Sequence, residues 1–381
     1  MDAATSSVDK ARLLAADFAK RAAAHDRDAS FPFENFQQLS DAGLLSLTVP
    51  RERGGLGAGM LESVRVLNQL ARGCPSTALV LAMHYIQHYS MAHGRPWPKH
   101  LAELMARESV SGLGLVNVLR VEPELGSPSR GGTMATVARR TAEGWRLSGH
   151  KIYSTGLPIL KWYSVWARTD ETEPRLGTFL VPAGLAGAKI VETWDHAGLR
   201  ASGSHDLVLQ DVLIPSDYEI DVRSPGEWRA GDPIGLIVHG TFVAAIYDGV
   251  ARAARDWVVQ FLQNRKPPNL GAALATLPRA QEIVGGIEVK LTTNTRLLES
   301  FAADYDSGRG TSMADAQALK MTLTNNAVAA VEEALSLTGN HGLSRTNPLE
   351  RHLRDVLCGR VHTPQDDTIK LTAGRLALGI Q

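Results

Sequence analysis

Apolar residues recur at helical spacing along the first part of the chain, from Val8 to about Val110. Leu61, Val64, Leu67 and Leu70 form one such set, and a period near 3.6 residues is typical of helices with one buried face. Proline and glycine punctuate the pattern at Pro32, Pro50, Gly54, Pro75 and Pro96. The pattern therefore predicts about five helices and a helical domain over residues 1–111.

The amino-acid composition changes between residues 112 and 222. Glycine and serine become more frequent, and short runs rich in valine, threonine and tryptophan appear at residues 133–140, 144–148, 177–181 and 207–213. Such runs, bounded by turn residues, predict β-strands. We therefore expect a β domain over residues 112–222, inserted between two helical domains.

Helical spacing returns after about Gly231, which predicts a third domain over residues 231–381. Ile283, Ile287, Leu291 and Leu298 mark one apolar face, and Gly308-Arg309-Gly310 predicts a break before the next helix. The apolar stretch from residue 233 to 251 contains His239, Tyr247 and Asp248, which favours a buried core helix over a membrane span. Pattern alone predicts a mixed, helix-rich fold.

Composition narrows the classes of function. The 381 residues are 44% hydrophobic, and the 40 basic and 40 acidic residues cancel, so the concentrated basic field that nucleic acids and anionic membranes require is not indicated. Cys74 and Cys358 are the two cysteines, too few for a disulfide scaffold or a thiolate metal site. Together with the early acidic residues Asp2 and Asp9, which argue against a secretory signal, they suggest a cytoplasmic protein without a bound metal.

Motifs for other kinds of redox or hydrolytic site are missing from the sequence. The glycine-rich segment 55–60 lacks the last glycine of a dinucleotide fingerprint, and neither a Walker loop, a Gly-x-Ser-x-Gly elbow nor a His-Glu-x-x-His pair occurs. Side chains carry no redox couple suited to hydride or oxygen chemistry, so a bound cofactor would have to supply it.

Five segments, in order, resemble the acyl-CoA dehydrogenase superfamily of flavoproteins. They are residues 31–57, 122–127, 149–156, 194–215 and 339–364, the last containing Asn347-Pro348-Leu349-Glu350-Arg351 and ending in His362-Thr363-Pro364. The resemblance implies a mostly α fold with a helical N-terminal domain, a middle β-barrel and a C-terminal four-helix bundle. It also implies a bound FAD, with FMN as the alternative, and a homodimer or homotetramer.

The resemblance assigns flavin contacts within the chain. Thr155 would meet the flavin N5, Tyr153 would lie against the ring, and Ser154 belongs to the same loop. Ser127 would reach the pyrophosphate, where a hydroxyl suits the negative charge. Without the resemblance, residues 122–127 are an ordinary turn and Tyr153 an ordinary residue of the β domain.

Other contacts would serve the cofactor of a neighbouring subunit. Arg265, followed by Gln281, resembles the arginine that reaches that pyrophosphate, and Ser336, Gly339 and Asn340 resemble a cofactor-contacting turn. The segment after Arg265 is two residues longer than the corresponding segment of the family. The alternative interpretation is that Arg265 is an ordinary charged residue at the end of a helix. Arg351, Arg354 and Asp355 are expected to form a structural ion-pair network.

The catalytic base is where the sequence departs from the family. Its usual glutamate position falls on Thr363, and the alternative position of some relatives falls on His239. His362 is similar to a histidine of the oxygen-activating branch, and histidine titrates near neutral pH. His84 and His88, four residues apart in an apolar helix, would share one face and could line the same cavity.

These residues favour flavin-hydroperoxide monooxygenation of a small organic substrate, with His362, His84 and His239 as candidate acid or base. A flavin reductase or an electron-transfer flavoprotein would be the redox partner. Two alternatives stay open: an FAD-dependent acyl-thioester dehydrogenase with a non-standard base, and a non-catalytic flavin-binding or scaffold protein.

Overall fold

Five helices open the computed structural model, which describes residues 5–94, 97–125, 134–228 and 233–380. They are α1 (Ser7–Asp28), α2 (Phe33–Asp41), α3 (Met60–Gly73), α4 (Pro75–His93) and α5 (Lys99–Ser111). The hydroxyl of Ser6 caps α1 by accepting from the Asp9 N–H, and Pro75 occupies the first turn of α4, where its missing N–H is harmless. The prediction of about five helices is confirmed for this part of the chain.

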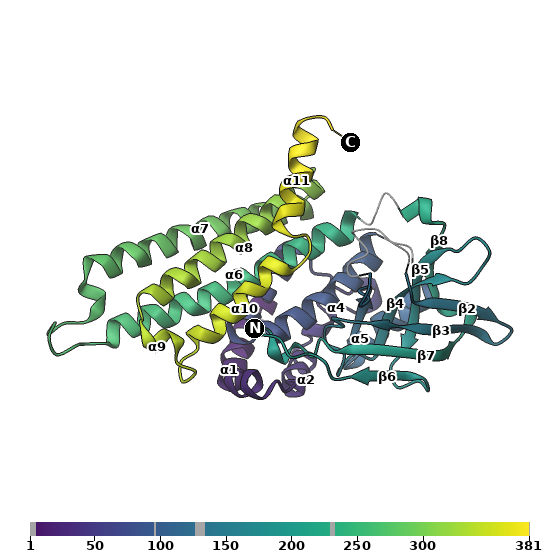
Figure 1. Ribbon diagram of the computed structural model, residues 1–381, viewed down its shortest axis with the longest axis horizontal. Helices are drawn as coiled ribbons and strands as arrows, with labels where there is room; N and C mark the ends of the chain where they lie inside the picture. The colour runs from purple at the N-terminus through teal and green to yellow at the C-terminus, as the bar shows by residue number, and fades with distance from the viewer. Residues whose placement is uncertain (1–4, 95–96, 126–133, 229–232, 381) are drawn as a thin grey trace.

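The middle of the chain forms one eight-stranded sheet, seen at one end of the molecule in Figure 1. The strands are β1 (Val116–Leu119), β2 (Val137–Thr141), β3 (Gly144–Lys151), β4 (Trp162–Thr169), β5 (Leu176–Pro182), β6 (Ala188–Val191), β7 (Asp206–Ile214) and β8 (Glu219–Arg223). Their order is β6-β7-β3-β2-β4-β5-β8, and β1 pairs in parallel with β4.

Long helices complete the chain. They are α6 (Pro233–Asn264), α7 (Pro278–Asp306), α8 (Met313–Ser336), α9 (Asn340–Leu343), α10 (Leu349–Val361) and α11 (Asp366–Ala377). Ile287, Leu291 and Leu298 are buried, and the predicted break at residues 308–310 separates α7 from α8. Short 3₁₀ turns lie at Leu44–Ser46, Arg51–Arg53, Arg200–Ser202, Ser216–Tyr218, Pro225–Trp228 and Leu274–Thr276.

The first and third domains share one apolar core, because α3 packs directly against α6. A Cβ added to Gly249 would lie 2.5 Å from the Asn68 carbonyl oxygen, so only glycine permits this approach. Asn68 Nδ2 donates to the Ala245 carbonyl at 3.0 Å and to Asp248 Oδ2 at 2.9 Å. Asp306, at the end of α7, accepts from the Met60 and Leu61 N–H groups that begin α3.

Helix α6 is long and apolar enough to cross a membrane, yet 78% of its most apolar stretch is buried inside the protein. Valine, alanine and phenylalanine side chains around Phe242 are fully covered by α3, α4 and α8. The interpretation of this segment as a core helix is therefore confirmed.

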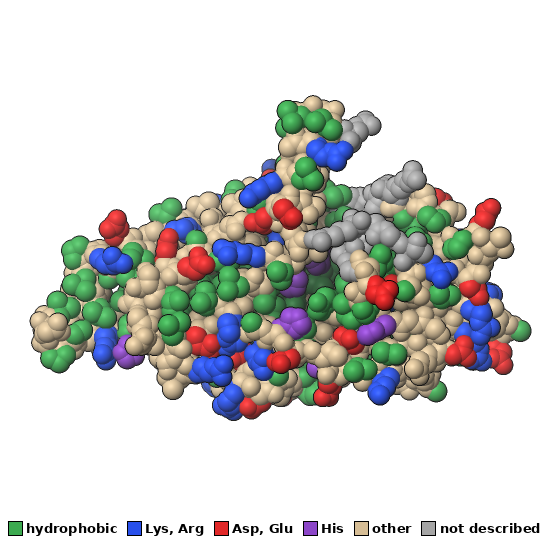
Figure 2. Space-filling model, in the orientation of Figure 1, with side chains coloured by type: hydrophobic (Ala, Val, Ile, Leu, Met, Phe, Trp, Pro, Cys, Tyr) green, Lys and Arg blue, Asp and Glu red, His purple; other side chains and the backbone are tan. Residues whose placement is uncertain are grey.

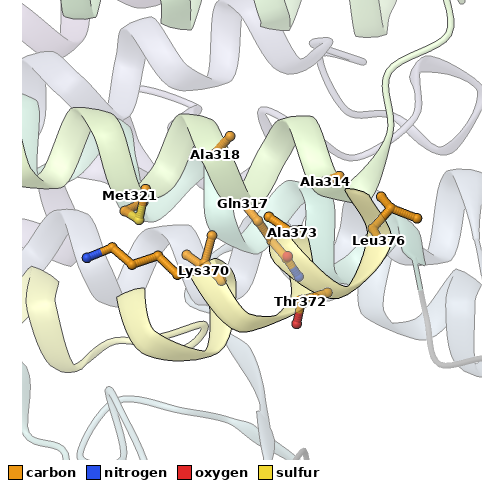
Figure 3. A pocket seen from close by; sticks show the side chains of 9 residues that line it. Ala314, Gln317, Ala318, Met321, Lys370, Thr372, Ala373 and Leu376 are labelled. Atoms are coloured by element: carbon orange, nitrogen blue, oxygen red, sulfur yellow. The ribbon is translucent and has the colours of Figure 1, made fainter. Parts of the chain in front are cut away.

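The last helix, α11, projects from the body of the molecule (Figure 1). Along most of its length α11 borders a shallow groove against α8. Met321, Ala318 and Ala314 lie on one wall, and Lys370, Ala373 and Leu376 lie on the other (Figure 3). Leu371, Leu376 and Leu378 are mostly exposed, so α11 presents apolar side chains to the outside of a single chain.

Candidate functional site

A tight turn after β3 holds the residues that the resemblance assigned to the flavin ring. Tyr153 has the left-handed φ of 54°, a conformation that is uncommon for a non-glycine residue and often marks a functional site. The Gly156 N–H donates to the Ser202 carbonyl at 2.9 Å. A Cβ on Gly156 would lie 2.6 Å from Val80 Cγ1 of α4. The turn is thus fixed between the β domain and the first domain.

Aromatic rings surround the outer side of this turn. Tyr153 is 54% exposed, and its ring meets the edges of Trp194 and His196 at centroid distances of 6.2 and 5.8 Å. Trp194 and His196 stack on each other at 3.7 Å. Together they form a partly exposed cluster of aromatic rings against which a heteroaromatic ring can pack.

Polar groups lie on the inner side of the same turn. The buried Ser154 Oγ has no hydrogen-bond partner in the described structure, while Thr155 Oγ1 pairs with Ser204 Oγ at 3.0 Å. Asn117, on β1, donates from Nδ2 to the Thr155 carbonyl at 3.0 Å; sequence reasoning missed this residue. Ser127 lies outside the described residues.

A buried ion pair lies at the start of the segment 122–127, which the resemblance assigned to the flavin. Lys151 Nζ lies 2.7 Å from Glu122 Oε1, and the side chains are 0% and 2% exposed. Glu122 also accepts from the Ala135 and Thr136 N–H groups at 2.7 and 3.0 Å. Burial raises the pKa of Glu122, but the hydrogen bonds from Lys151 and Thr136 outweigh it and give a net decrease. The carboxylate is therefore ionised and ties residue 122 to residues 135–136.

His362 follows α10, and the exposed Thr363 stands beside it. The His362 Nδ1 and the Tyr247 hydroxyl are 2.6 Å apart. Tyr247 is fully buried and has no other acceptor among the described residues, so its O–H donates to Nδ1. A neutral ring then carries its proton on Nε2. Figure 2 shows histidine side chains beside a hollow between the bundle and the β domain.

Charged neighbours act on His362 and His239. Burial, His239 and Lys320 lower the pKa of His362 to about 3. Burial, Lys320 and Arg120 lower the pKa of His239 to about 4. The pKa of His362 thus lies below the neutral range in which a free histidine titrates, because desolvation and the neighbouring positive groups disfavour the protonated ring.

His84 and His88 share a face of α4, as predicted, with ring centroids 4.6 Å apart. Both are buried. The two ring nitrogens of His84 pair with the Leu45 carbonyl at 3.0 Å and the Val116 N–H at 3.2 Å, and His88 Nε2 pairs with Ser109 Oγ at 2.8 Å. A catalytic role for His84 is not supported, because both of its nitrogens serve the backbone.

The remaining predicted contacts gather at the far end of the bundle (Figure 1). Arg265 is exposed at the end of α6, Gln281 donates to the Ala275 carbonyl at 3.1 Å, and Ser336 donates to the Glu333 carbonyl at 2.7 Å. Gly339 and Asn340 begin α9 nearby, where His341 packs on Phe261. The two halves of the predicted cofactor site do not meet within one chain, and a role in a neighbouring subunit stays a prediction.

The predicted ion-pair network is present at Arg354 but does not include its two predicted partners. Among the described residues Arg351 and Asp355 form no ion pair, and Arg351 Nε is buried without a hydrogen-bond partner. Arg354 donates to both Asp26 carboxylate oxygens at 2.9 and 2.6 Å and to Glu350 Oε2 at 2.8 Å. Asp355 Oδ1 accepts from the Leu199 N–H at 2.7 Å. These contacts tie α10, and with it His362, to α1 and to the segment that follows Trp194 and His196.

Family models match most of the chain. "Acyl-CoA dehydrogenase, N-terminal domain" matches residues 5–98, the middle domain of the same family matches residues 120–212, and its C-terminal domain matches residues 241–366. The chain belongs to the acyl-CoA dehydrogenase family. The predicted fold class and the prediction of a flavin-dependent oxidoreductase are thereby confirmed.

Relatives within the family are named for different activities. A putative acyl-CoA dehydrogenase of Bacillus subtilis, YdbM, is 33% identical, covering 95% of this chain and 94% of the relative. L-evernosamine nitrososynthase of a Micromonospora species is 32% identical, covering 94% and 86%. The structure of KijD3 with FMN and dTDP-3-amino-2,3,6-trideoxy-4-keto-3-methyl-D-glucose superposes with a TM-score of 0.85 at 29% identity, covering 100% and 97%.

Proposed function

We propose that the chain is a flavin-dependent monooxygenase that transfers an oxygen atom to a small organic substrate. The observation that carries the proposal is the chemistry of the two base positions, which hold Thr363, beside His362, and His239. A general base works best when its pKa lies near the working pH. Histidines whose pKa values are lowered to about 3 and about 4 are weak bases for removing the α proton of a thioester.

The relatives support oxygen transfer to an amine. The Micromonospora relative is named as a nitrososynthase, and the sugar nucleotide in the KijD3 structure carries an amino group. We therefore expect the substrate to be a primary amine, such as an amino sugar. A free amine carries the lone pair that an electrophilic oxygen requires.

The residues around Tyr153 fit a flavin, either FAD or FMN. The unpartnered Ser154 Oγ and the Thr155 hydroxyl are polar groups beside an aromatic surface, and such a combination suits a ring with a polar edge. Asn117 fixes the Thr155 carbonyl and so orients the turn. When bound and reduced, the flavin supplies the electrons that activate dioxygen.

His362 has a defined role in this proposal. The Tyr247 O–H occupies Nδ1 and holds the ring in the Nε2–H tautomer. Because burial and the cationic neighbours keep the ring neutral, His362 acts as a hydrogen-bond donor from Nε2. It would orient an oxygen atom without giving up its proton.

A second candidate is an acyl-thioester dehydrogenase, which the similarity to the putative acyl-CoA dehydrogenase of Bacillus subtilis favours. In that case another group would remove the α proton. The two candidates differ in what reduces the flavin, because a thioester substrate does so directly and an amine substrate does not.

The test uses the flavin-loaded protein in two assays. Butyryl-CoA is added without oxygen while flavin absorbance is recorded. Separately, a reductase and NADH reduce the flavin under ¹⁸O₂ in the presence of a panel of primary amines and amino sugars. The proposal expects no bleaching by the thioester and ¹⁸O in an amine product. Bleaching without ¹⁸O incorporation would establish the dehydrogenase instead.

The variant Thr363→Glu restores a carboxylate at the family's base position. We expect this variant to keep its flavin but to transfer less oxygen, because the new carboxylate would counteract the positive charge of Lys320 near His362. Thr346→Glu, on the loop between α9 and α10, adds the same charge on the surface and serves as the control. Equal oxygen transfer in both variants would contradict the assignment of the site.

A further inference from the structure

Lys320, on α8, is a charged residue in an unusual place. Its side chain is 0% exposed, and Nζ has no hydrogen-bond partner in the described structure. The stem passes Gly240 of α6, since a Cβ added there would lie 3.8 Å from Lys320 Cβ. Gly240 follows His239 directly, and His239 is the residue at the family's alternative base position.

The groups that face Lys320 come from three elements. His239 belongs to α6, His362 follows α10, and Asp366 begins α11. The charge of Arg120, after β1, also lowers the pKa of His239. Asp366 does not form an ion pair with Lys320 within 4.0 Å, and its Oδ2 accepts from Asn325 at 2.7 Å. Burial lowers the pKa of Lys320, and the charge of Asp366 partly offsets this.

A buried ammonium without a partner costs free energy, so the unpartnered Lys320 Nζ calls for an anionic ligand. Its charge also acts on His239 and His362. By the resemblance, some relatives carry a glutamate at the position of His239, whereas this chain has no carboxylate there. Two hydrogen-bond donors remain available: Lys320 Nζ, and His362 Nε2–H, whose tautomer Tyr247 fixes.

We propose that Lys320 and His362 form an oxyanion site, in which the buried ammonium and the imidazole N–H together bind an oxygen atom that carries negative charge. The proposal rests on the proposed function, because oxygen transfer places a developing negative charge on the oxygen that stays behind. Fixed positive groups in a buried site stabilise such charge strongly. A carboxylate at this position would repel it.

The experiment measures anion binding in flavin-free protein, independently of turnover. Sodium nitrate is titrated at constant ionic strength into protein labelled with ¹⁵N-histidine, and the ring resonances of His239 and His362 are followed near neutral pH. His239→Gln and His362→Gln variants assign the resonances. We expect a saturable nitrate shift of His362 in the parent protein.

Lys320→Met should weaken nitrate binding roughly tenfold or more, as expected for the loss of a charged hydrogen-bond donor, and Lys320→Arg should retain most of it. Lys290→Met, which removes a bundle lysine paired with Glu333, should bind like the parent. Circular dichroism confirms folding, and Lys320→Gln replaces the methionine variant if that one does not fold.

Two results would overturn the oxyanion site: a parent protein without a saturable nitrate shift, or a Lys320→Met variant with unchanged nitrate affinity. The ¹⁸O assay separates this inference from the proposed function. Nitrate binding that depends on Lys320 in a protein that transfers no oxygen would remove the proposed function alone. Oxygen transfer without such binding would remove the oxyanion site alone.

Discussion

Replacing Lys151 by methionine should destabilise the β domain strongly. The change keeps the length of the side chain but leaves the Glu122 carboxylate buried without its cation. Both side chains are almost fully buried, and removal of one partner from a buried pair typically costs about 3–5 kcal/mol. The Ala135 and Thr136 donors remain, so we expect the lower end, about 3 kcal/mol.

An exposed lysine pair provides the matched control. Lys161 also pairs with a glutamate, Glu108, but is 52% exposed, and exposed pairs contribute less than about 1 kcal/mol. Lys161→Met should therefore be nearly neutral. The double variant Glu122→Gln with Lys151→Met removes both charges and should recover most of the loss, because no buried charge stays unpaired.

Urea unfolding followed by tryptophan fluorescence suits this measurement. Five of the seven tryptophans lie in the β domain or next to it: Trp145, Trp162, Trp166, Trp194 and Trp228. Lys151→Met should also weaken flavin binding, because the Glu122 carboxylate holds the backbone of residues 135–136 in place. If Lys151→Met lowers the free energy of unfolding no more than Lys161→Met does, the buried pair does not support the β domain as argued.

Three further predictions concern other parts of the chain. Burial lowers the pKa of His84 from 6.5 to about 4, so the neutral His84 ring contributes its full stability to the folded protein above pH 6.5. That contribution is lost as the pH falls toward 4, and about 2 kcal/mol is lost at pH 5. The melting temperature of His84→Gln should therefore change less with pH over this range than that of the parent protein. Arg265→Ala should reduce flavin affinity roughly tenfold or more, measured by flavin fluorescence, whereas Lys266→Ala should not; equal affinities would remove Arg265 from the cofactor site. Arg354→Met should lower the free energy of unfolding by about 2–3 kcal/mol, since it unpairs Asp26 and Glu350, and the exposed Arg309→Met provides the reference in the same urea titration.

The periodicity of apolar residues was sufficient to predict the helices, but it did not reveal the central strand β4. Helices such as α3 and α7 have one buried face, which a 3.6-residue pattern reveals. Strand β4 is covered on both faces, and seven of its eight residues are buried, so it has no alternation to detect. Strand β1 is four residues long, too short for a pattern.

The site was only partly predictable for a different reason. The turn at Tyr153–Gly156 and the histidine after α10 follow from local segments that resemble the family. The partners of His84 come from Leu45 and Val116, distant in sequence, so its structural role was hidden. Lys320 left a signal that was missed: it lies four residues after the buried Ala316, on the apolar face of a helix.

The packing of α3 against α6 has a consequence for how the chain folds during synthesis. Asn68 and Ala245, which form one of the contacts, are 177 positions apart. On the ribosome, α3 emerges long before α6, and its apolar side chains, among them Val64 and Leu67, lack their partner for the whole time that the β domain is made. The first domain cannot finish folding until the last third of the chain is available, which makes the nascent chain a natural client for chaperones.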